Sequence, residues 1–296
     1  MKRRNFIKTT GLLSGACLLP NLSWGPSNAL SGISIPGFGL ITGNTGGKWL
    51  EANPQKALKE ISELGYTDLE FGNTFGMDVQ SLKSFLKELN LRPLIGSTDM
   101  AAMNDTERLM KNIKSCHELD KEYIVCYWPW TDDGKNKKAD DWKRVADNLN
   151  KGGEICTKEG LKLLYHNHDL EFYPTEGQMP FDILVPTLNP EHVNIELDLY
   201  WITKGNQSAI EYIKKYPGRY PVFHVKDMDK TPDRSFEYVG KGIIDFASIF
   251  QLNDIAGAKH FIVEHDNPAS PEECIKAGAA YLTRFLVSKN KNNTKA

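Results

Sequence analysis

Acidic and imidazole side chains cluster near the C-terminal ends of several short apolar segments. Side chains along an extended strand alternate between two faces, so residues two apart point to the same side. Four segments pair polar groups in this way: His166 with His168, Glu196 with Asp198, His224 with Lys226, and Glu264 with Asp266. Imidazole and carboxylate groups together suit a borderline or hard divalent ion such as Mn, Mg, Co or Zn. Because buried carboxylates are costly unless they are paired or bind a metal, this joint occurrence predicts a divalent metal site.

Taken singly, several of these residues have structural roles open to them. Asp198 alone would cap the turn that follows it, and Glu264 alone would be a buried salt-bridge partner. Trp128 and Trp201 stand near segment ends, where they would stack on a sugar ring or serve only as packing. Asn167 faces away from His166 by the same alternation, and we assign it to substrate binding together with the two tryptophans.

Eight apolar segments with strand character alternate with segments of helical periodicity. This alternation predicts a parallel sheet, because parallel strands need a crossover connection. Eight units without a linker favour closure into a single (β/α)8 TIM barrel of the α/β class, in which catalytic groups stand at the C-terminal ends of the strands. We expect strands at 38–42, 67–72, 92–97, 123–128, 162–168, 193–201, 222–227 and 260–266, and helices at 54–64, 79–89, 142–158, 210–216, 245–252 and 271–286.

An open doubly wound sheet is the alternative architecture. Such a sheet would be expected to carry a glycine-rich phosphate turn after its first strand. The segment 42–47 is rich in glycine, but it lacks both the GxGxxG spacing and the Lys-Ser/Thr of a P-loop. Nucleotide binding is therefore disfavoured.

The first 29 residues have the pattern of a twin-arginine export signal. A basic run containing Arg3 and Arg4 precedes a short apolar stretch, and the small residues at 27–29 predict cleavage after Ala29. The apolar stretch is shorter than the roughly 20 residues of a membrane helix, so we expect no stable membrane span. A basic N-terminal helix and lipidation at Cys17 are the alternatives. The signal predicts an exported, periplasmic protein whose barrel domain covers residues 30–296.

The composition of the 296-residue chain is that of an ordinary globular protein, with 40% hydrophobic and 25% charged residues. It excludes a disordered, collagen-like or membrane-spanning chain. The 36 basic and 38 acidic residues give a net charge of -2, and removal of residues 1–29 leaves 32 against 38, or -6. We therefore expect no nucleic-acid partner. Five cysteines without CxxC spacing exclude a disulfide scaffold or a zinc ribbon, and the four that follow the signal (Cys116, Cys126, Cys156 and Cys274) are predicted to be buried thiols. No pattern indicates an oligomeric state.

Several motifs together resemble the sugar phosphate isomerase/epimerase family, the xylose-isomerase-like TIM barrel group. The resemblance extends over nearly the whole chain after the signal. The motifs are Leu-Tyr-His-Asn-His-Asp-Leu-Glu-Phe (164–172), Leu-Asp-Leu-Tyr-Trp (197–201), His-Val-Lys-Asp-Met (224–228), Gly-Lys-Gly-Ile-Ile-Asp-Phe (240–246) and Val-Glu-His-Asp (263–266).

The resemblance implies metal ligands at matching positions. Asp198 matches the family's ligand on the sixth strand, His224 the ligand on the seventh, and Glu264 the ligand on the eighth. The fifth-strand ligand of the family is commonly glutamate, and the matching residue here is His166. In the epimerases that glutamate is also one of two acid/base groups, so this chain departs from the two-glutamate mechanism.

The chemistry shared by the family implies a divalent-metal-dependent sugar isomerase or epimerase. In that chemistry a metal chelates the carbonyl and adjacent hydroxyl of an α-hydroxyketone and stabilises the enediolate that forms when a base removes a neighbouring proton. Glu264, His168 and Glu70 are the candidate bases, and Lys226 would hold an oxyanion or assist proton transfer.

Two alternatives to the isomerase or epimerase follow. Expulsion of a group β to the carbonyl gives elimination, and the inosose dehydratase branch similarly carries a histidine-rich fifth strand, so one alternative is a lyase or dehydratase acting on a 3-keto sugar or glycoside. A non-catalytic exported carbohydrate-binding barrel is the alternative of another class. Export favours an unphosphorylated sugar or keto-sugar as the small-molecule substrate, although Gly240-Lys241-Gly242 is a candidate anion site.

Overall fold

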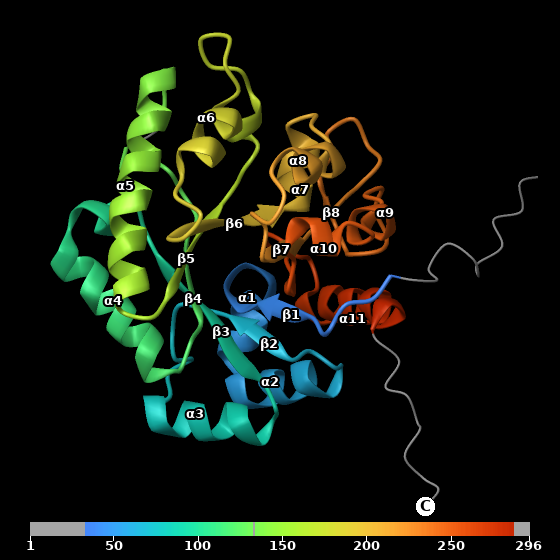
Figure 1. Ribbon diagram of the computed structural model, residues 1–296. Coiled ribbons are helices and arrows are strands. Elements are labelled where there is room, and N and C mark those ends of the chain that lie inside the picture. The colour runs from blue at the N-terminus through green and yellow to red at the C-terminus, as the bar shows by residue number, and fades with distance from the viewer. Residues whose placement is uncertain (1–32, 133, 287–296) are drawn as a thin grey trace, which may run out of the picture. The chain divides into compact units, whose positions relative to one another are not determined.

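The computed structural model describes residues 33–132 and 134–286. The predicted export signal, its cleavage site and Cys17 lie outside these residues. Within them, eight parallel strands close into a barrel in the order β1-β10-β7-β6-β5-β4-β3-β2 (Figure 1), which confirms the predicted TIM barrel. The barrel strands are β1 (Gly39–Ile41), β2 (Asp68–Glu70), β3 (Arg92–Thr98), β4 (Tyr123–Cys126), β5 (Lys162–His166), β6 (Val193–Asp198), β7 (Val222–Val225) and β10 (His260–Val263).

Helices connect successive strands around the outside of the barrel (Figure 1). A short antiparallel pair, β8 (Asp227–Met228) with β9 (Phe236–Glu237), follows β7. The α-helices are α1 (Thr42–Ala52), α2 (Pro54–Glu63), α3 (Val79–Glu88), α4 (Thr106–Glu118), α5 (Ala139–Lys158), α6 (Pro180–Thr187), α7 (Leu199–Lys204), α8 (Ala209–Lys215), α9 (Phe246–Phe250), α10 (Asn253–Ala256) and α11 (Pro271–Leu282), and the 3-10 helices are η1 (Ala102–Asn104), η2 (Leu170–Phe172) and η3 (Thr283–Phe285).

Side-chain caps fix where several helices begin. The side chain of Asn53 accepts a hydrogen bond from the Lys56 N–H at the start of α2, and Ser270 does the same for Glu273 at the start of α11. Asp198 caps α7 by accepting from the Trp201 N–H. This cap ends β6 three residues earlier than the expected 193–201, because the chain turns into a helix directly after Asp198.

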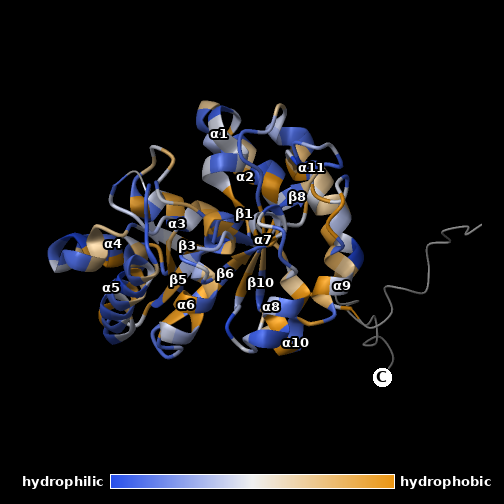
Figure 2. Ribbon diagram, turned by 90° about the horizontal axis from the view of Figure 1, so that it is seen from above, coloured by the Kyte–Doolittle hydropathy of each residue, from blue (hydrophilic) through white to orange (hydrophobic). Residues whose placement is uncertain are grey.

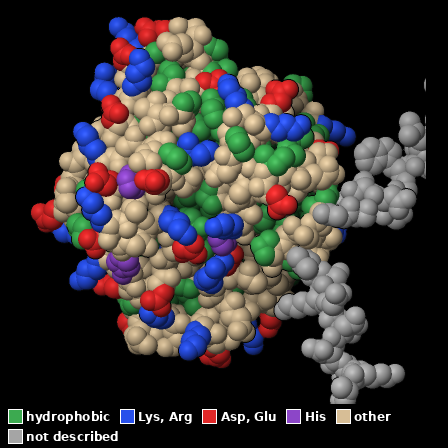
Figure 3. Space-filling view, viewed as in Figure 1, with side chains coloured by type: hydrophobic (Ala, Val, Ile, Leu, Met, Phe, Trp, Pro, Cys, Tyr) green, Lys and Arg blue, Asp and Glu red, His purple; other side chains and the backbone are tan. Residues whose placement is uncertain are grey.

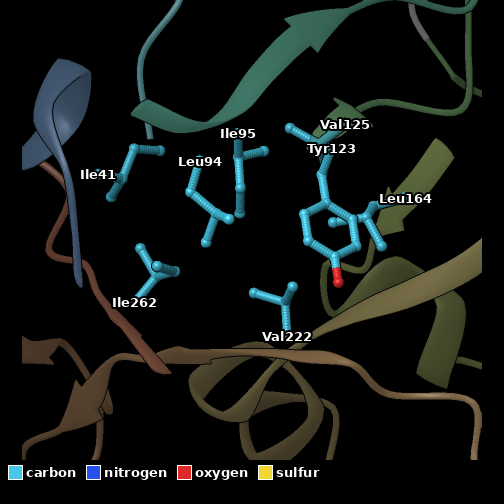
Figure 4. Close-up of a cluster of buried hydrophobic side chains, with 8 residues drawn as sticks. All are labelled: Ile41, Leu94, Ile95, Tyr123, Val125, Leu164, Val222 and Ile262. Atoms are coloured by element: carbon cyan, nitrogen blue, oxygen red, sulfur yellow. The ribbon is translucent and has the colours of Figure 1, made fainter. Parts of the chain in front are cut away.

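The barrel interior is filled by apolar side chains from most of its strands. Figure 4 shows them converging from opposite sides of the barrel, with Tyr123 among aliphatic neighbours. This layer closes the barrel core, so polar side chains at the strand ends stand above a packed floor. The cluster consists of Ile41, Leu94, Ile95, Tyr123, Val125, Leu164, Val222 and Ile262.

The outer surface is polar and mixed in charge. In Figure 2 the central strands are mostly hydrophobic in colour, whereas α4 and α5 are hydrophilic on their outward sides. Basic and acidic side chains are interspersed on the face seen in Figure 3. Among the described residues, no helix combines the length and apolar character that crossing a membrane requires. Cys116, Cys126, Cys156 and Cys274 are buried free thiols, as expected.

Candidate metal centre and active-site cavity

The four residues assigned as metal ligands lie together at the C-terminal end of the barrel. His166 ends β5, Asp198 ends β6, His224 lies within β7, and Glu264 directly follows β10. The strand register brings them side by side, because Asp198 pairs with His224 across β6 and β7. One potential ligand atom from each residue lies within 4.8 Å of the others, and all four side chains are buried.

Contacts within this cluster join imidazoles to carboxylates. Nδ1 of His224 lies 2.8 Å from Oε2 of Glu264. Nε2 of His166 lies 3.9 Å from Oδ2 of Asp198, which is too far for a hydrogen bond. The ligand atoms of the cluster therefore surround a common space.

Asp198 shows that the cluster fits a cation. Its Oδ1 is used by the α7 cap, at 2.7 Å from the Trp201 N–H. Its Oδ2 is buried and has no hydrogen-bond partner within residues 33–132 and 134–286. A fully buried carboxylate oxygen without a partner is costly, and a divalent ion held by His166, Asp198, His224 and Glu264 would satisfy it. The imidazole and carboxylate donor set suits zinc, manganese or cobalt.

The pKa values of the two carboxylates in the cluster shift in opposite directions. Burial raises the pKa of Asp198 well above its usual value. Burial also acts to raise the pKa of Glu264, but the positive charge of Lys226 and the His224 ring outweigh it and lower that pKa well below its usual value. For His224, burial acts to lower the pKa, but the carboxylates of Glu196, Glu70 and Glu264 outweigh it and raise the pKa well above its usual value. Glu264 is therefore ionised and held by two neighbours.

Lys226 forms a second polar group beside the cluster. Its ammonium lies 2.5 Å from Oδ2 of Asp266 and 3.6 Å from Oε2 of Glu264, and only 1% of its side chain is exposed. Burial acts to lower its pKa, but the neighbouring carboxylates raise it to about 12. Asn44 completes this group, because its Nδ2 donates to Oε1 of Glu264 at 3.0 Å and to Oδ1 of Asp266 at 2.8 Å. Lys226 is thus a fixed cation and a poor proton donor near neutral pH.

A cavity of about 330 Å³ opens over this end of the barrel. Its walls combine ligand residues, the Lys226 group and aromatic side chains. This mixture suits a small polar ligand with an apolar ring face. The lining residues are Ile41, Gly43, Asn44, Phe71, Gly72, Ser97, Tyr127, His166, His168, Trp201, Lys226, Glu264 and Asp266.

His168 lies on the cavity wall as a neutral base. Its ring stands 5.0 Å from the ring of His166 and 5.3 Å from that of Trp201, measured between centroids. Burial lowers the pKa of His168 to about 4, and its Nδ1 has no hydrogen-bond partner in the part of the chain that the structure describes. His168 is therefore neutral near pH 7, and its ring forms part of the cavity wall while Nδ1 is buried behind it.

Glu70, the third candidate base, is placed differently. It is fully buried, and both of its carboxylate oxygens are engaged. Oε2 lies 2.9 Å from Nε2 of His224, and Oε1 accepts a short hydrogen bond from the hydroxyl of Tyr127. These contacts make Glu70 a partner of His224 and give it no free oxygen for a ligand in the cavity.

The residues assigned to substrate binding are spread over different positions. Trp201 lines the cavity, with the Lys226 ammonium 4.9 Å from its ring centroid. Trp128 is 42% exposed and lies edge-on to the ring of His168 at 5.2 Å. Asn167 is buried, and its amide bonds the main chain of Asp198 in both directions, accepting from the N–H at 2.9 Å and donating to the carbonyl at 3.3 Å. Asn167 therefore positions Asp198, and its contacts give no support for substrate binding.

In the candidate anion site at 240–242, the main-chain N–H groups bind the side chain of Asp227. The N–H groups of Gly240 and Gly242 both donate to Oδ2 of Asp227, at 2.9 and 3.0 Å. These amides are taken by the chain's own carboxylate, so the expectation of an anion there is wrong. These hydrogen bonds fasten the 240–242 loop to Asp227, which directly follows Lys226 in the sequence.

The fold and the site define a class, a TIM barrel with a buried cluster of carboxylates and imidazoles, able to hold a metal ion, at the C-terminal ends of its strands. The chain belongs to the xylose isomerase-like TIM barrel family, whose model matches residues 58–285. It is similar to the inosose dehydratase of Geobacillus kaustophilus (strain HTA426), with 25% identity over 270 residues, 78% of this chain and 87% of the relative. The inosose dehydratase of Clostridium botulinum (strain Alaska E43 / Type E3) is 24% identical over 266 residues, covering 77% and 88% of the two chains.

Solved structures show the same architecture. A sugar phosphate isomerase/epimerase from Parabacteroides distasonis ATCC 8503 superposes with a TM-score of 0.73 and 25% identity, covering 87% of this chain and 97% of the other. The IOLI protein, solved with a bound zinc atom, has a TM-score of 0.69 and 17% identity over 84% of this chain and 99% of the other. Such relatives support an enzyme of the isomerase, epimerase or dehydratase kind.

Proposed function

We propose that this protein is a divalent-metal-dependent lyase that eliminates water or an alcohol from a cyclic keto-sugar or related polyhydroxyketone. The observation that supports the proposal is His168, a neutral imidazole whose ring lines the cavity beside the four-ligand cluster. The dehydratase relatives support elimination over the isomerisation that the motifs first suggest.

The presence of His166 on β5, where an epimerase of the two-glutamate kind has a carboxylate, favours a mechanism with one acid/base residue over a mechanism with two. An epimerase of the two-glutamate kind needs a second carboxylate at the position of His166. Here Nδ1 of His166 lies 3.0 Å from Glu196, and its Nε2 faces the ligand cluster, so neither nitrogen is free to exchange a proton with substrate. His168 is then the group in the cavity that is able to take a proton, while Glu264 is held by His224, Lys226 and Asn44.

The proposed reaction balances as a β-elimination. The imidazole of His168 takes the proton from the carbon next to the ketone, and the electron pair of that C–H bond becomes the new C=C bond. The C–O bond at the β carbon breaks with its electron pair on the oxygen, which takes the proton that His168 now carries and departs as water or an alcohol, so the imidazole is neutral again. A divalent ion at the cluster would supply positive charge beside the ketone oxygen. Lys226, a fixed cation on the cavity wall, would stabilise negative charge that develops on an oxygen of the substrate.

The test compares His168→Asn with His117→Asn, a matched change on the exposed surface of α4. Wild-type protein, loaded with zinc, manganese or cobalt, is incubated with an inosose and with a 3-keto glycoside. We expect an enone, seen by its ultraviolet absorption, and release of water or the aglycone. The rate should fall by about 10²- to 10⁴-fold in the His168 variant and stay unchanged in the His117 variant. Elimination that persists in His168→Asn would contradict the proposal.

A metal-dependent isomerase or epimerase is the second candidate, favoured by the similarity to the Parabacteroides protein. It shares the first step, removal of the proton next to the carbonyl. In D₂O it predicts incorporation of deuterium and a new ketose or epimer without an enone. That result with free ketoses, together with no elimination from any keto-glycoside, would replace the lyase by the isomerase.

A further inference from the structure

Glu196 lies directly between the two histidines of the metal centre. It stands two residues before Asp198 on β6, on the same face of the strand, and pairs in register with His166 on β5. Its side chain is fully buried. Oε2 of Glu196 lies 3.0 Å from Nδ1 of His166 and 3.2 Å from Nε2 of His224. One carboxylate oxygen thus contacts two imidazoles on neighbouring strands.

Each histidine turns one nitrogen to Glu196 and the other to the ligand cluster. For His166 the nitrogen facing the cluster is Nε2, which approaches Oδ2 of Asp198. For His224 it is Nδ1, which lies 2.8 Å from Oε2 of Glu264. The ring nitrogen that binds a metal is set by the hydrogen bond that the other nitrogen makes. For His166 that hydrogen bond goes from Nδ1 to Glu196. For His224 it goes from Nε2 to Glu70, with Glu196 at 3.2 Å from the same nitrogen.

We propose that Glu196 is a positioning residue that orients His166 through a hydrogen bond and supports the ring of His224 by charge, so that His166 presents Nε2 and His224 presents Nδ1 to a single ion. This inference rests on the metal centre of the proposed function and adds the group that sets the tautomer of His166. Glu70 supports only one of the rings, because its Oε2 contacts Nε2 of His224 at 2.9 Å. His166 therefore depends on Glu196 more than His224 does.

The experiment measures metal binding directly and needs no substrate. The metal affinities of wild-type protein, Glu196→Gln and Glu171→Gln are compared by competition with a chelator. Glu171 is a matched control, because it is a fully buried carboxyl group. It accepts hydrogen bonds from the Tyr165 hydroxyl and from the main-chain N–H of His168, and it contacts neither histidine ligand ring. We expect Glu196→Gln to bind zinc or cobalt 10- to 100-fold more weakly, the range typical of such orienting partners, and Glu171→Gln to bind as the wild type does.

Two spectroscopic measurements separate orientation from loss of folding. In the ¹⁵N NMR spectrum of the zinc-loaded wild type, we expect His166 to carry its proton on Nδ1 and His224 on Nε2. Glu70→Gln should leave the His166 signal unchanged, whereas Glu196→Gln should shift it. The visible absorption of bound Co²⁺ should change in Glu196→Gln and stay constant in Glu171→Gln.

The outcomes distinguish this inference from the proposed function. A wild-type protein that binds no divalent ion overturns both. A wild-type protein that binds one ion, together with a Glu196→Gln variant of equal affinity and an unchanged cobalt spectrum, overturns the role of Glu196 alone. Two ions per chain, falling to one in Glu196→Gln, would also overturn it, since Glu196 would then be a ligand of a second ion with Glu70 and His224.

Discussion

Replacement of Lys226 by methionine should destabilise the metal-free protein far more than the metal-loaded protein. Methionine keeps most of the length of the side chain and removes its charge. Without metal, the ammonium is the fixed positive charge that faces both Glu264 and Asp266, and it is almost fully buried. Its removal leaves these carboxylates with less compensation, and Glu264 is itself buried.

The distances give the size of the effect. At 3.6 Å from Oε2 of Glu264, the Coulomb attraction is about 5 kcal/mol with an effective dielectric constant near 20. The hydrogen-bonded contact with Asp266 at 2.5 Å adds to this attraction, with a discount for solvent screening because 23% of that side chain is exposed. Since removal of one partner from a buried ion pair typically costs about 3–5 kcal/mol, we expect a loss of that size in the free energy of unfolding.

A bound ion changes the result in a known direction. Removal of a cation beside Glu264 lessens repulsion toward a divalent ion, so Lys226→Met should bind zinc more tightly than the wild type. Binding to the folded state then restores part of the lost stability. Turnover should fall nonetheless, because the charge on the cavity wall is gone.

Urea unfolding in EDTA and in excess zinc measures both quantities. The control is Lys56→Met, which removes an exposed pair with Glu60 four residues away, at 3.5 Å, and should change stability by less than about 0.5 kcal/mol. A loss below about 1 kcal/mol for Lys226→Met in EDTA would refute the reasoning. So would an equal loss with and without zinc.

Three further predictions follow from other parts of the chain. Asp198→Asn should weaken metal binding by more than about 100-fold, as chelator competition would show. It should leave the metal-free protein at least as stable as the wild type, because burial of a carboxylate with one unpartnered oxygen disfavours folding. A metal-free variant that urea unfolds more easily than the wild type would contradict the account of Asp198. Burial raises the pKa of Glu171 to about 8, so the folded protein keeps a proton that the unfolded chain has lost between about pH 5 and 8. Stability should fall as pH rises through this window, by at most about 1.4 kcal/mol per pH unit, and Glu171→Gln should remove that part of the slope; parallel slopes in urea unfolding at pH 5.5, 7 and 8.5 would argue against it. Residues 1–29 fused to a reporter that folds in the cytoplasm should direct it to the periplasm, and replacement of Arg3 and Arg4 by lysine should stop this export; a reporter retained with both arginines intact would exclude the signal.

The residues at the strand ends were predictable because the period of a β-strand is fixed. Alternation places His166, Asp198 and His224 on the inner side of their strands, and a closed barrel brings the ends of neighbouring strands together. The sequence alone therefore indicates which side chains meet. The same rule places Glu196 beneath Asp198, but it does not say which nitrogen of each imidazole faces this carboxylate.

Contacts made by loops and helices were not predictable in this way. Asn44 lies in a glycine-rich segment whose sequence indicates only a candidate phosphate turn, yet the segment begins α1, and the Asn44 amide donates to Glu264. Helix α4, over Thr106–Glu118, lies outside the expected helices. The sequence predicts substrate binding for Asn167, but its amide bonds the main-chain N–H and carbonyl of Asp198. Such contacts depend on how far a loop reaches and on which backbone groups are left unpaired.

The arrangement of charge around the cluster bears on how one family supports both isomerases and dehydratases. Removal of a proton next to a ketone is common to the two reactions, and it needs a base together with a positive field at the oxygen. In this chain the field is supplied by groups whose partners fix them: Lys226 by Asp266, and Glu264 by His224 and Asn44. The proposed base, His168, lines the cavity with its ring. We propose that the choice between reprotonation and loss of a β substituent depends on whether a second proton carrier faces the substrate. His166 stands where the family commonly has a glutamate, and both of its nitrogens are directed elsewhere, which is consistent with elimination.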